Sequence, residues 1–126
     1  MVSLPTKQHK RFESKKIIWM ATTKPNSQPH LVPVWFVLSD GNIFVWTKRK
    51  SVKARNLREN PRITIALETG SKPLIGEGRV INSFNPADIL HIIDKFSEKY
   101  DWSNYTDTDY DIIFEIEIMK WIHFND

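Results

Sequence analysis

The residues best suited to chemistry lie in the segment TKRKSVKARNL, residues 47–57, where Lys48, Arg49 and Lys50 precede a serine typical of a helix N-cap. Lys53 then falls in the first turn of the predicted helix. A helix N-terminus is partly positive, so each cation there is unfavourable by a few tenths to about 1 kcal/mol. This pattern indicates a site that binds an anion.

A phosphate group fits this position best. Thr47 should end a strand and Ser51 should begin the helix, so that two hydroxyls, Lys53 and backbone N–H groups converge on one point. A bound phosphate would also give the neighbouring cations a counter-charge. The alternative is a solvated lysine-rich loop without a ligand, which is the commoner role of a charge run.

The charge of the chain is unevenly distributed along the sequence. Residues 1–62 carry 13 Lys and Arg against 3 Asp and Glu (+10), whereas residues 63–126 carry 5 against 12 (−7), which together give the net charge of +3. The asymmetry favours an anionic partner for the first half. The alternative is that the two charged halves mix in space.

Length and composition set further limits. With 126 residues the chain should form one domain, residues 1–126, with a hydrophobic core that needs no cross-links. It contains no cysteine, which excludes thiol nucleophiles, iron–sulfur clusters and cysteine-ligated zinc. The longest apolar run, residues 31–38, is too short to cross a membrane, and no leader segment is visible. We expect a cytoplasmic protein.

The elements that position the basic segment can be predicted from patterning. The run HLVPVWFVL, residues 30–38, predicts one continuous strand buried on both faces, and Asp40-Gly41 predicts a hairpin to its partner. Asn85-Pro86 predicts the N-cap and first position of a later helix. Helices are expected at residues 5–12, 51–60 and from 85 onward; strands are expected at residues 16–22, 30–38, 42–47, 62–68 and 74–81, with an alternating pair at 112–118 and 120–124. About six strands with inserted helices predict an antiparallel barrel of α+β type.

The segment PHLVPVWFVLSDGNIFVWTKRKSVKARNLRENPRITIALE, residues 29–68, resembles the pyridoxamine 5′-phosphate oxidase-like flavin-binding split-barrel family. The matching pattern is a proline-led apolar strand, a hairpin, a strand ending in an aromatic residue and Thr, then Ser51-x-Lys53 opening a helix that closes at Asn60-Pro61-Arg62. Weaker similarity extends the resemblance over most of residues 17–82. It implies a six-stranded antiparallel split β-barrel with short peripheral helices.

The resemblance also implies a cofactor site. The phosphate of a flavin or deazaflavin would lie at Thr47, Ser51 and Lys53, and the edge of the ring along the strand of Pro33. The cofactor-binding residues implied are His30, Val32, Pro33, Val34, Trp46, Thr47, Lys48, Ser51, Val52 and Lys53, with Arg49 as an alternative to Lys48. No catalytic side chain and no metal ligand is predicted. The family is typically homodimeric with the cofactor between subunits.

Two departures indicate the subgroup. The true oxidases carry an Arg where this chain has Leu31, and they end in Arg-Leu-x-Pro, whereas residues 120–126 read KWIHFND. The chain is therefore more similar to the general flavin- or deazaflavin-dependent reductases than to enzymes that oxidise vitamin B6. FMN is the first expectation for the cofactor, and a deazaflavin is the alternative.

Three hypotheses remain. The first is an FMN-dependent oxidoreductase that transfers hydride through flavin N5 to or from a small organic substrate. The second is a module that binds flavin or haem without turnover. The third is nucleic-acid binding through residues 48–62, where seven cations accompany one acid and Trp46 could stack on a base.

Other chemistries lack their motifs. The sequence has no GxSxG, P-loop or HExxH motif, and its four histidines show no ligand spacing. The segment KYDWSNYTDTDYD, residues 99–111, is predicted to connect a helix to the last strands, although it could cover a pocket mouth. Trp19, Trp35 and Trp46 are expected to fill the barrel core for the most part.

Overall fold

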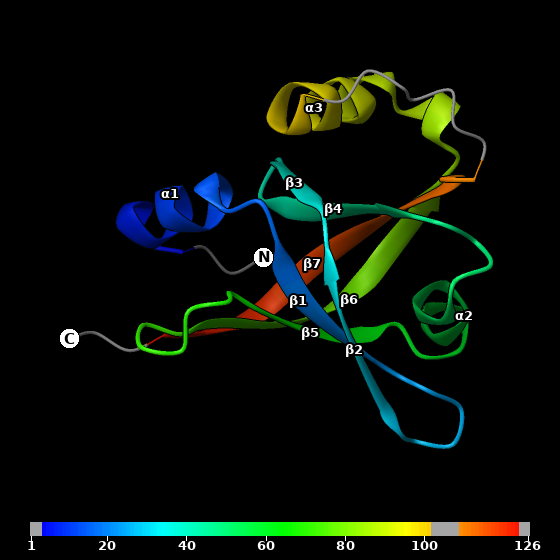
Figure 1. The fold of residues 1–126 in the computed structure, drawn as a ribbon, viewed down its shortest axis with the longest axis horizontal. Coiled ribbons are helices and arrows are strands. Elements are labelled where there is room, and N and C mark those ends of the chain that lie inside the picture. Colours follow the sequence, from blue (N-terminus) through cyan, green and yellow to red (C-terminus); the bar gives the residue numbers. More distant parts are fainter. Residues whose placement is uncertain (1–3, 102–108, 124–126) are drawn as a thin grey trace.

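The computed structural model describes residues 4–101 and 109–123, which form a curled antiparallel sheet with helices around it (Figure 1). The strands in this part of the chain are β1 (Ile18–Thr23), β2 (Pro29–Val34), β3 (Phe36–Ser39), β4 (Asn42–Thr47), β5 (Arg62–Ala66), β6 (Leu74–Phe84) and β7 (Ile112–His123). The helices are α1 (Thr6–Ser14), α2 (Val52–Glu59), α3 (Leu90–Tyr100) and the short 3₁₀ helix η1 (Pro86–Asp88).

The strand order is β2-β1-β5-β6-β7-β4-β3, and every neighbouring pair is antiparallel. The two edge strands, β2 and β3, are consecutive in the chain and are separated only by Trp35. The sheet must therefore curl until its edges approach each other. This confirms the α+β antiparallel split barrel, with seven strands among the described residues instead of the predicted six.

The prediction of one strand over residues 30–38, buried on both faces, is wrong. The run divides at Trp35, and its first half, β2, pairs only with β1. Leu31 is 60% exposed because its side chain lies on the outer face of this edge strand. Pro29 and Pro33 suit this position, since a proline cannot donate a hydrogen bond to a second neighbouring strand.

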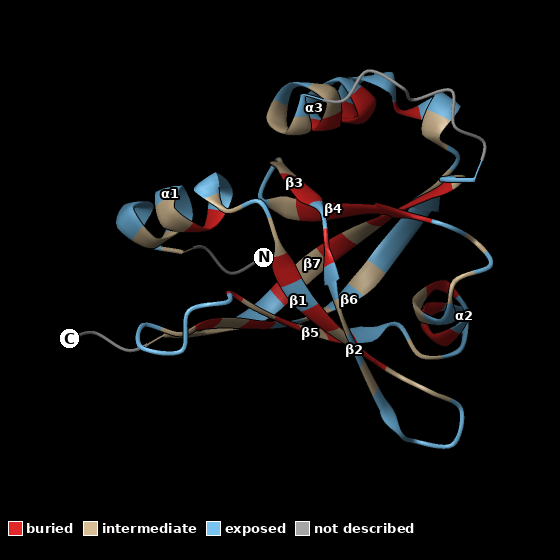
Figure 2. Ribbon diagram, in the orientation of Figure 1, coloured by how far each residue is buried: buried red, intermediate tan, exposed pale blue. Residues whose placement is uncertain are grey.

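Two apolar clusters hold the fold together (Figure 2). The larger one fills the inside of the curl with alternate residues of the strands, and Phe12 of α1 packs into it against Phe36 at a centroid distance of 4.8 Å. The smaller one joins α3 to the outer face of β3, β4 and β7 through Ile92, Ile93 and Phe96.

The expectation that Trp19, Trp35 and Trp46 for the most part fill the barrel core is wrong, since none of them belongs to the cluster inside the curl. Trp46 is 7% exposed and belongs to the cluster beneath α3. Trp19 is 38% exposed and Trp35 is 44% exposed. Trp19 lies on the outer face of β1, where its neighbours Ile18 and Met20 point inward, and Trp35 lies at the break between the edge strands.

Helix boundaries follow local sequence at α2 but not before α3. Ser51 caps α2 as predicted, because its Oγ accepts a hydrogen bond from the Ala54 N–H at 3.2 Å. The helix predicted at Asn85-Pro86 is instead η1, and α3 begins only at Leu90. Asn85 makes no side-chain cap, since its Oδ1 accepts a hydrogen bond from the guanidinium of Arg49.

The C-terminal half contributes the long antiparallel pair of β6 and β7, which are separated in the chain by η1 and α3. The predicted segments 112–118 and 120–124 form the single strand β7 as far as His123, with a register shift opposite Glu77 and Gly78, and residue 124 lies outside the described residues. Within the part of the chain that the structure describes, no helix is long and apolar enough to span a membrane.

Candidate functional site

A cavity of about 450 Å³ opens between the break of the edge strands, the end of β4, the start of α2 and the helix α3. Its size is typical of a small-molecule or cofactor site. The lining residues are Ile17, Pro33, Val34, Trp35, Trp46, Thr47, Lys53, Phe96 and Tyr110. Seven of these nine are apolar or aromatic, so the walls suit a flat, largely apolar ligand.

The aromatic walls are held in place by specific contacts. The Trp46 indole Nε1 donates a hydrogen bond to the Tyr110 carbonyl at 2.8 Å, and its ring meets Phe96 edge to face at a centroid distance of 5.5 Å. Trp35 stacks on Tyr100 with a centroid distance of 4.2 Å and an interplanar angle of 2°. The aromatic surface is therefore largely formed before any ligand arrives.

One end of the cavity is cationic. Thr47 is buried where β4 ends, and Lys53 is half-buried in the first turn of α2. Burial, and secondarily the charge of Lys48, lower the pKa of Lys53. Neither lysine forms an ion pair within the described residues. A negatively charged ligand group would relieve this unfavourable accumulation of charge.

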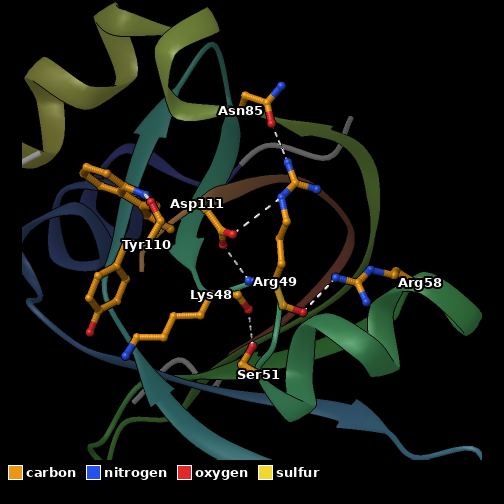
Figure 3. Close-up of polar contacts among 8 residues, drawn as sticks. Lys48, Arg49, Ser51, Arg58, Asn85, Tyr110 and Asp111 are labelled. Atoms are coloured by element: carbon orange, nitrogen blue, oxygen red, sulfur yellow. Dashed lines mark hydrogen bonds and ion pairs between the residues drawn. The ribbon is translucent and has the colours of Figure 1, made fainter. Parts of the chain in front are cut away.

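The loop before α2 is held by its own contacts (Figure 3). The Arg49 N–H donates to Asp111 Oδ1 at 2.8 Å, and its Nε lies 3.8 Å from Asp111 Oδ2. Arg58 donates to the Arg49 carbonyl at 2.7 Å. Lys48 instead extends toward Tyr110, with Nζ 5.1 Å from the ring centroid (Figure 3). Arg49 and Arg58 thus stabilise the loop, which leaves Lys48 and Lys53 for a ligand.

The hydroxyl of Ser51 is engaged in the helix cap. It donates to the Lys48 carbonyl at 2.7 Å and accepts from Ala54 N–H at 3.2 Å. The N–H groups at the start of a helix have no partner within the helix, so α2 offers those of Val52 and Lys53 to an anion. Ser51 acts on the site chiefly by fixing where the helix begins.

The cavity brings together half of the residues that the sequence suggested. Pro33, Val34, Trp46, Thr47 and Lys53 line it, whereas His30, Val32, Lys48, Ser51 and Val52 do not. Lys48, Ser51 and Val52 lie in the chain between Thr47 and Lys53, the two lining residues at the cationic end. His30 pairs with Thr22 across β1 and β2, and its Nδ1 is buried without a hydrogen-bond partner in the described structure.

Sequence reasoning missed four lining residues, namely Ile17, Trp35, Phe96 and Tyr110. Phe96 follows the helical period of a core residue, and nothing in that pattern distinguishes a core face from a cavity wall. Tyr110 belongs to the segment interpreted as a connector, of which residues 102–108 lie outside the described structure. For Trp35 a signal was present, since it is the one tryptophan inside the apolar run 30–38 that was predicted to face the cofactor.

Comparison with solved structures supports the same architecture. An F420 reductase superposes with a TM-score of 0.79 at 18% identity, over 94% of this chain and 98% of that one. A conserved hypothetical protein from Mycobacterium tuberculosis gives 0.83 at 24% identity, over 99% and 86%. The haem storage protein of Vibrio cholerae gives 0.74 at 18% identity, over 94% and 93%. At these identities the likeness establishes the fold.

The sequence itself was compared with curated proteins and with protein families. No curated protein matched it. The family described as pyridoxamine 5′-phosphate oxidase matched over residues 5–122, which include every lining residue of the cavity. A match over that much of the chain, on a split barrel of the expected topology, shows that the chain belongs to the pyridoxamine 5′-phosphate oxidase family.

Proposed function

We propose that this protein binds FMN in the cavity and acts as a flavin-dependent oxidoreductase on a small organic substrate. One observation carries the proposal: an aromatic-walled cavity of about 450 Å³ ends at a half-buried lysine and a helix N-terminus. A planar apolar ring with an anionic arm is complementary to both parts.

The chain's own residues have distinct roles in this proposal. Lys53 and the N–H groups at the start of α2 hold the phosphate, Thr47 adds a hydroxyl, and Lys48 adds charge from the rim. Pro33 and Val34 contact the ring edge, while Trp35 and the other aromatic residues exclude water. FMN, when bound, supplies hydride transfer at its N5 position.

The residues around the cavity fit a reaction carried by a cofactor. The side chains that line the cavity are mostly apolar, and the half-buried Lys53 forms no ion pair with a carboxylate among the described residues. The proposal therefore assigns orientation and exclusion of water to the protein, with no obligatory acid or base. We place this activity in the cytoplasm, which cell fractionation would test.

A deazaflavin is the second candidate cofactor. One structural relative is an F420 reductase, F420 is a deazaflavin, and the same cationic end would hold its phosphate. Haem is the third, because another relative is a haem storage protein. Nucleic acid is supported least: Trp46 is buried, and Arg49 and Arg58 already bind within the fold.

We also propose that the protein is a homodimer. Across the outer face of the sheet, the pairing register aligns an apolar outer row of Ile122, Ile75, Ala66, Trp19 and Pro33. Solvent contact along five aligned strands is costly for apolar side chains, and a second copy would remove it. Because Pro33 belongs to both the outer row and the cavity, the partner would lie beside the ligand.

The test is a titration of the ligand-free protein with FMN, followed by tryptophan quenching, with F420 and haemin in parallel. Saturable binding of FMN at micromolar concentration, followed by reduction with NAD(P)H, is the expected result. Binding of F420 or haemin in preference to FMN would redirect the assignment. Binding of none of them would contradict it and make salt-dependent binding of RNA or DNA the next measurement.

A further inference from the structure

Tyr100, the last residue of α3, does not line the cavity but contacts the backbone beside it. Its hydroxyl accepts a hydrogen bond from the Phe36 N–H at 2.8 Å. The same oxygen lies 3.0 Å from the Phe36 carbonyl and 2.9 Å from the Lys16 carbonyl, to one of which it donates. Burial raises the pKa of Tyr100 to about 12, so the hydroxyl keeps its proton at neutral pH.

These contacts join two chain segments that no strand pairing connects. Lys16 directly precedes Ile17, and Phe36 directly follows Trp35, so each bonded residue adjoins a lining residue of the cavity. β1 pairs with β2 and β5, whereas β3 pairs with β4 alone. The Tyr100 hydroxyl therefore bridges the split of the barrel at the edge of the cavity.

The ring of Tyr100 supports the cavity wall as well. It stacks on the Trp35 indole with ring planes within 2° of parallel, and Phe96 lies 6.0 Å away on the same helix. Trp35 is 44% exposed, and a half-exposed side chain at a break between strands has other rotamers available. Stacking against a ring that is itself anchored selects one of them.

We propose that Tyr100 is a positioning residue that fixes Trp35 as a flat wall of the cavity and thereby sets the affinity for the ring of the ligand. The part concerning affinity rests on the function proposed above. A wall that is ordered before binding lowers the entropic cost of holding a planar ring. The effect should concern the ring alone, because Lys53 and the start of α2 lie at the other end of the ligand.

The first measurement needs no ligand. Acrylamide quenching of Trp35, isolated as the difference between the wild type and Trp35→Phe, reports how freely that indole is reached. We expect at least twofold faster quenching in Tyr100→Leu, which lacks ring and hydroxyl, and a smaller increase in Tyr100→Phe. Glu98→Gln, an exposed change on the same helix, is the control and should match the wild type. Unchanged quenching in both Tyr100 variants overturns the positioning role.

The second measurement separates this role from general stabilisation. FMN and riboflavin share a ring, but riboflavin lacks the phosphate. Tyr100→Leu should weaken both by the same factor, about tenfold, whereas Lys53→Ala should weaken FMN alone. If Tyr100→Leu frees Trp35 yet both affinities are kept, Tyr100 does not set ring affinity. If the wild type binds neither flavin, the proposed function fails, and quenching alone decides whether Tyr100 positions Trp35.

Discussion

At the scale of single residues, the cationic end of the cavity explains why so many lysines and arginines precede a helix. Arg49 and Arg58 bind within the loop, whereas Lys48 and Lys53, at the cationic end of the cavity, form no ion pair among the described residues. A charged residue that remains half-buried without a partner is a stronger sign of a ligand than the charge run to which it belongs.

Lys53→Ala should weaken FMN binding by roughly 1.5–3 kcal/mol, the usual contribution of a hydrogen bond to a charged group. This corresponds to about a 10- to 150-fold higher Kd. The unfolding midpoint should not fall, because the variant removes a half-buried charge. The control is Arg55→Ala, which removes an exposed cation from the same helix. Equal losses in the two variants would indicate general electrostatic attraction instead of a phosphate site.

Lys99 should make stability depend on pH. Its burial and the nearby Lys16 lower its pKa to about 8 from 10.5, against an opposing effect of Glu13. Between pH 8 and 10.5 the unfolded chain then binds more protons at Lys99 than the folded chain does, so the free energy of unfolding should rise with pH. Tyr100 has the opposite effect between pH 10 and 12, because its raised pKa makes the folded chain bind more protons there. Lys99→Met should flatten the rise from pH 8 to 10 in urea unfolding.

The surroundings of the Lys99 ammonium limit the size of that effect. Lys99 is partly solvated, and its Nζ lies 3.6 Å from the centroid of the Phe36 ring, which favours the charged form. The gain of Lys99→Met at pH 7 should therefore stay below about 1 kcal/mol. Lys95→Met, an exposed change on α3, should leave the pH profile as in the wild type. If stability still rises between pH 8 and 10 in Lys99→Met, another titrating group is responsible for the rise.

At the scale of elements, β6 and β7 are the longest strands of the described chain, and β7 backbone lies very close to Gly78 of β6. A Cβ built on Gly78 would lie 2.2 Å from the Glu117 carbonyl oxygen. That atom belongs to the backbone of β7 and cannot rotate away. The register shift opposite Gly78 therefore requires glycine.

Gly78→Ala should destabilise the fold by on the order of 3 kcal/mol, because the two strands must separate to admit a methyl group. Urea unfolding measures this directly. Gly70→Ala is the matched control, since a Cβ there meets no atom within 4 Å and should change stability by less than about 1 kcal/mol. Similar midpoints for the two variants would contradict the close packing at Gly78.

Ser51 allows a test of how α2 builds the site. Ser51→Ala should lower stability by about 1 kcal/mol through loss of the cap. Ser51→Asp should restore stability, because aspartate also caps helices, yet weaken FMN, because its carboxylate repels the phosphate. Thermal unfolding measures the effect on stability, and FMN titration measures the effect on affinity. FMN affinity unchanged in Ser51→Asp would place the phosphate away from the start of α2.

At the scale of the whole molecule, the closure of the barrel leaves an apolar row partly exposed on the outer face of the sheet. The outer row extends from β7 to β2, and Leu31 lies beside it, 60% exposed on the edge strand. Among the described residues, α3 covers the outer face over β3, β4 and β7 and at the end of β6, where Phe84 packs against the same cluster. The remaining outer face is the surface that the proposed dimer would bury.

Leu31→Glu should shift the protein from dimer to a monomer of 14.8 kDa in sedimentation velocity, since it places a charge in the proposed interface. Leu90→Glu, which changes an equally exposed leucine on α3, should stay dimeric. FMN affinity should fall in Leu31→Glu, because the dimer dissociates, and should be unchanged in Leu90→Glu. A wild type that sediments as a monomer at tens of micromolar would exclude the dimer.

The sequence by itself determined the features that depend on neighbours in the chain. Ser51 caps α2, Asn60-Pro61 ends it, Asp40-Gly41 joins β3 to β4, and the basic residues lie between a strand end and a helix start. These are set by backbone preferences and charge over a few residues. The antiparallel split barrel also followed, from local patterning together with the family resemblance.

The tertiary structure alone decided how the run 30–38 is used. An apolar run is compatible with one buried strand or with two edge strands, and only closure of the sheet selects the break at Trp35. The same closure exposes Leu31 and brings Phe96, Tyr110 and Ile17 to one cavity. Such contacts join residues far apart in the chain. The entropic cost of closing the long loops between these residues is offset only by tertiary packing, which local sequence does not encode.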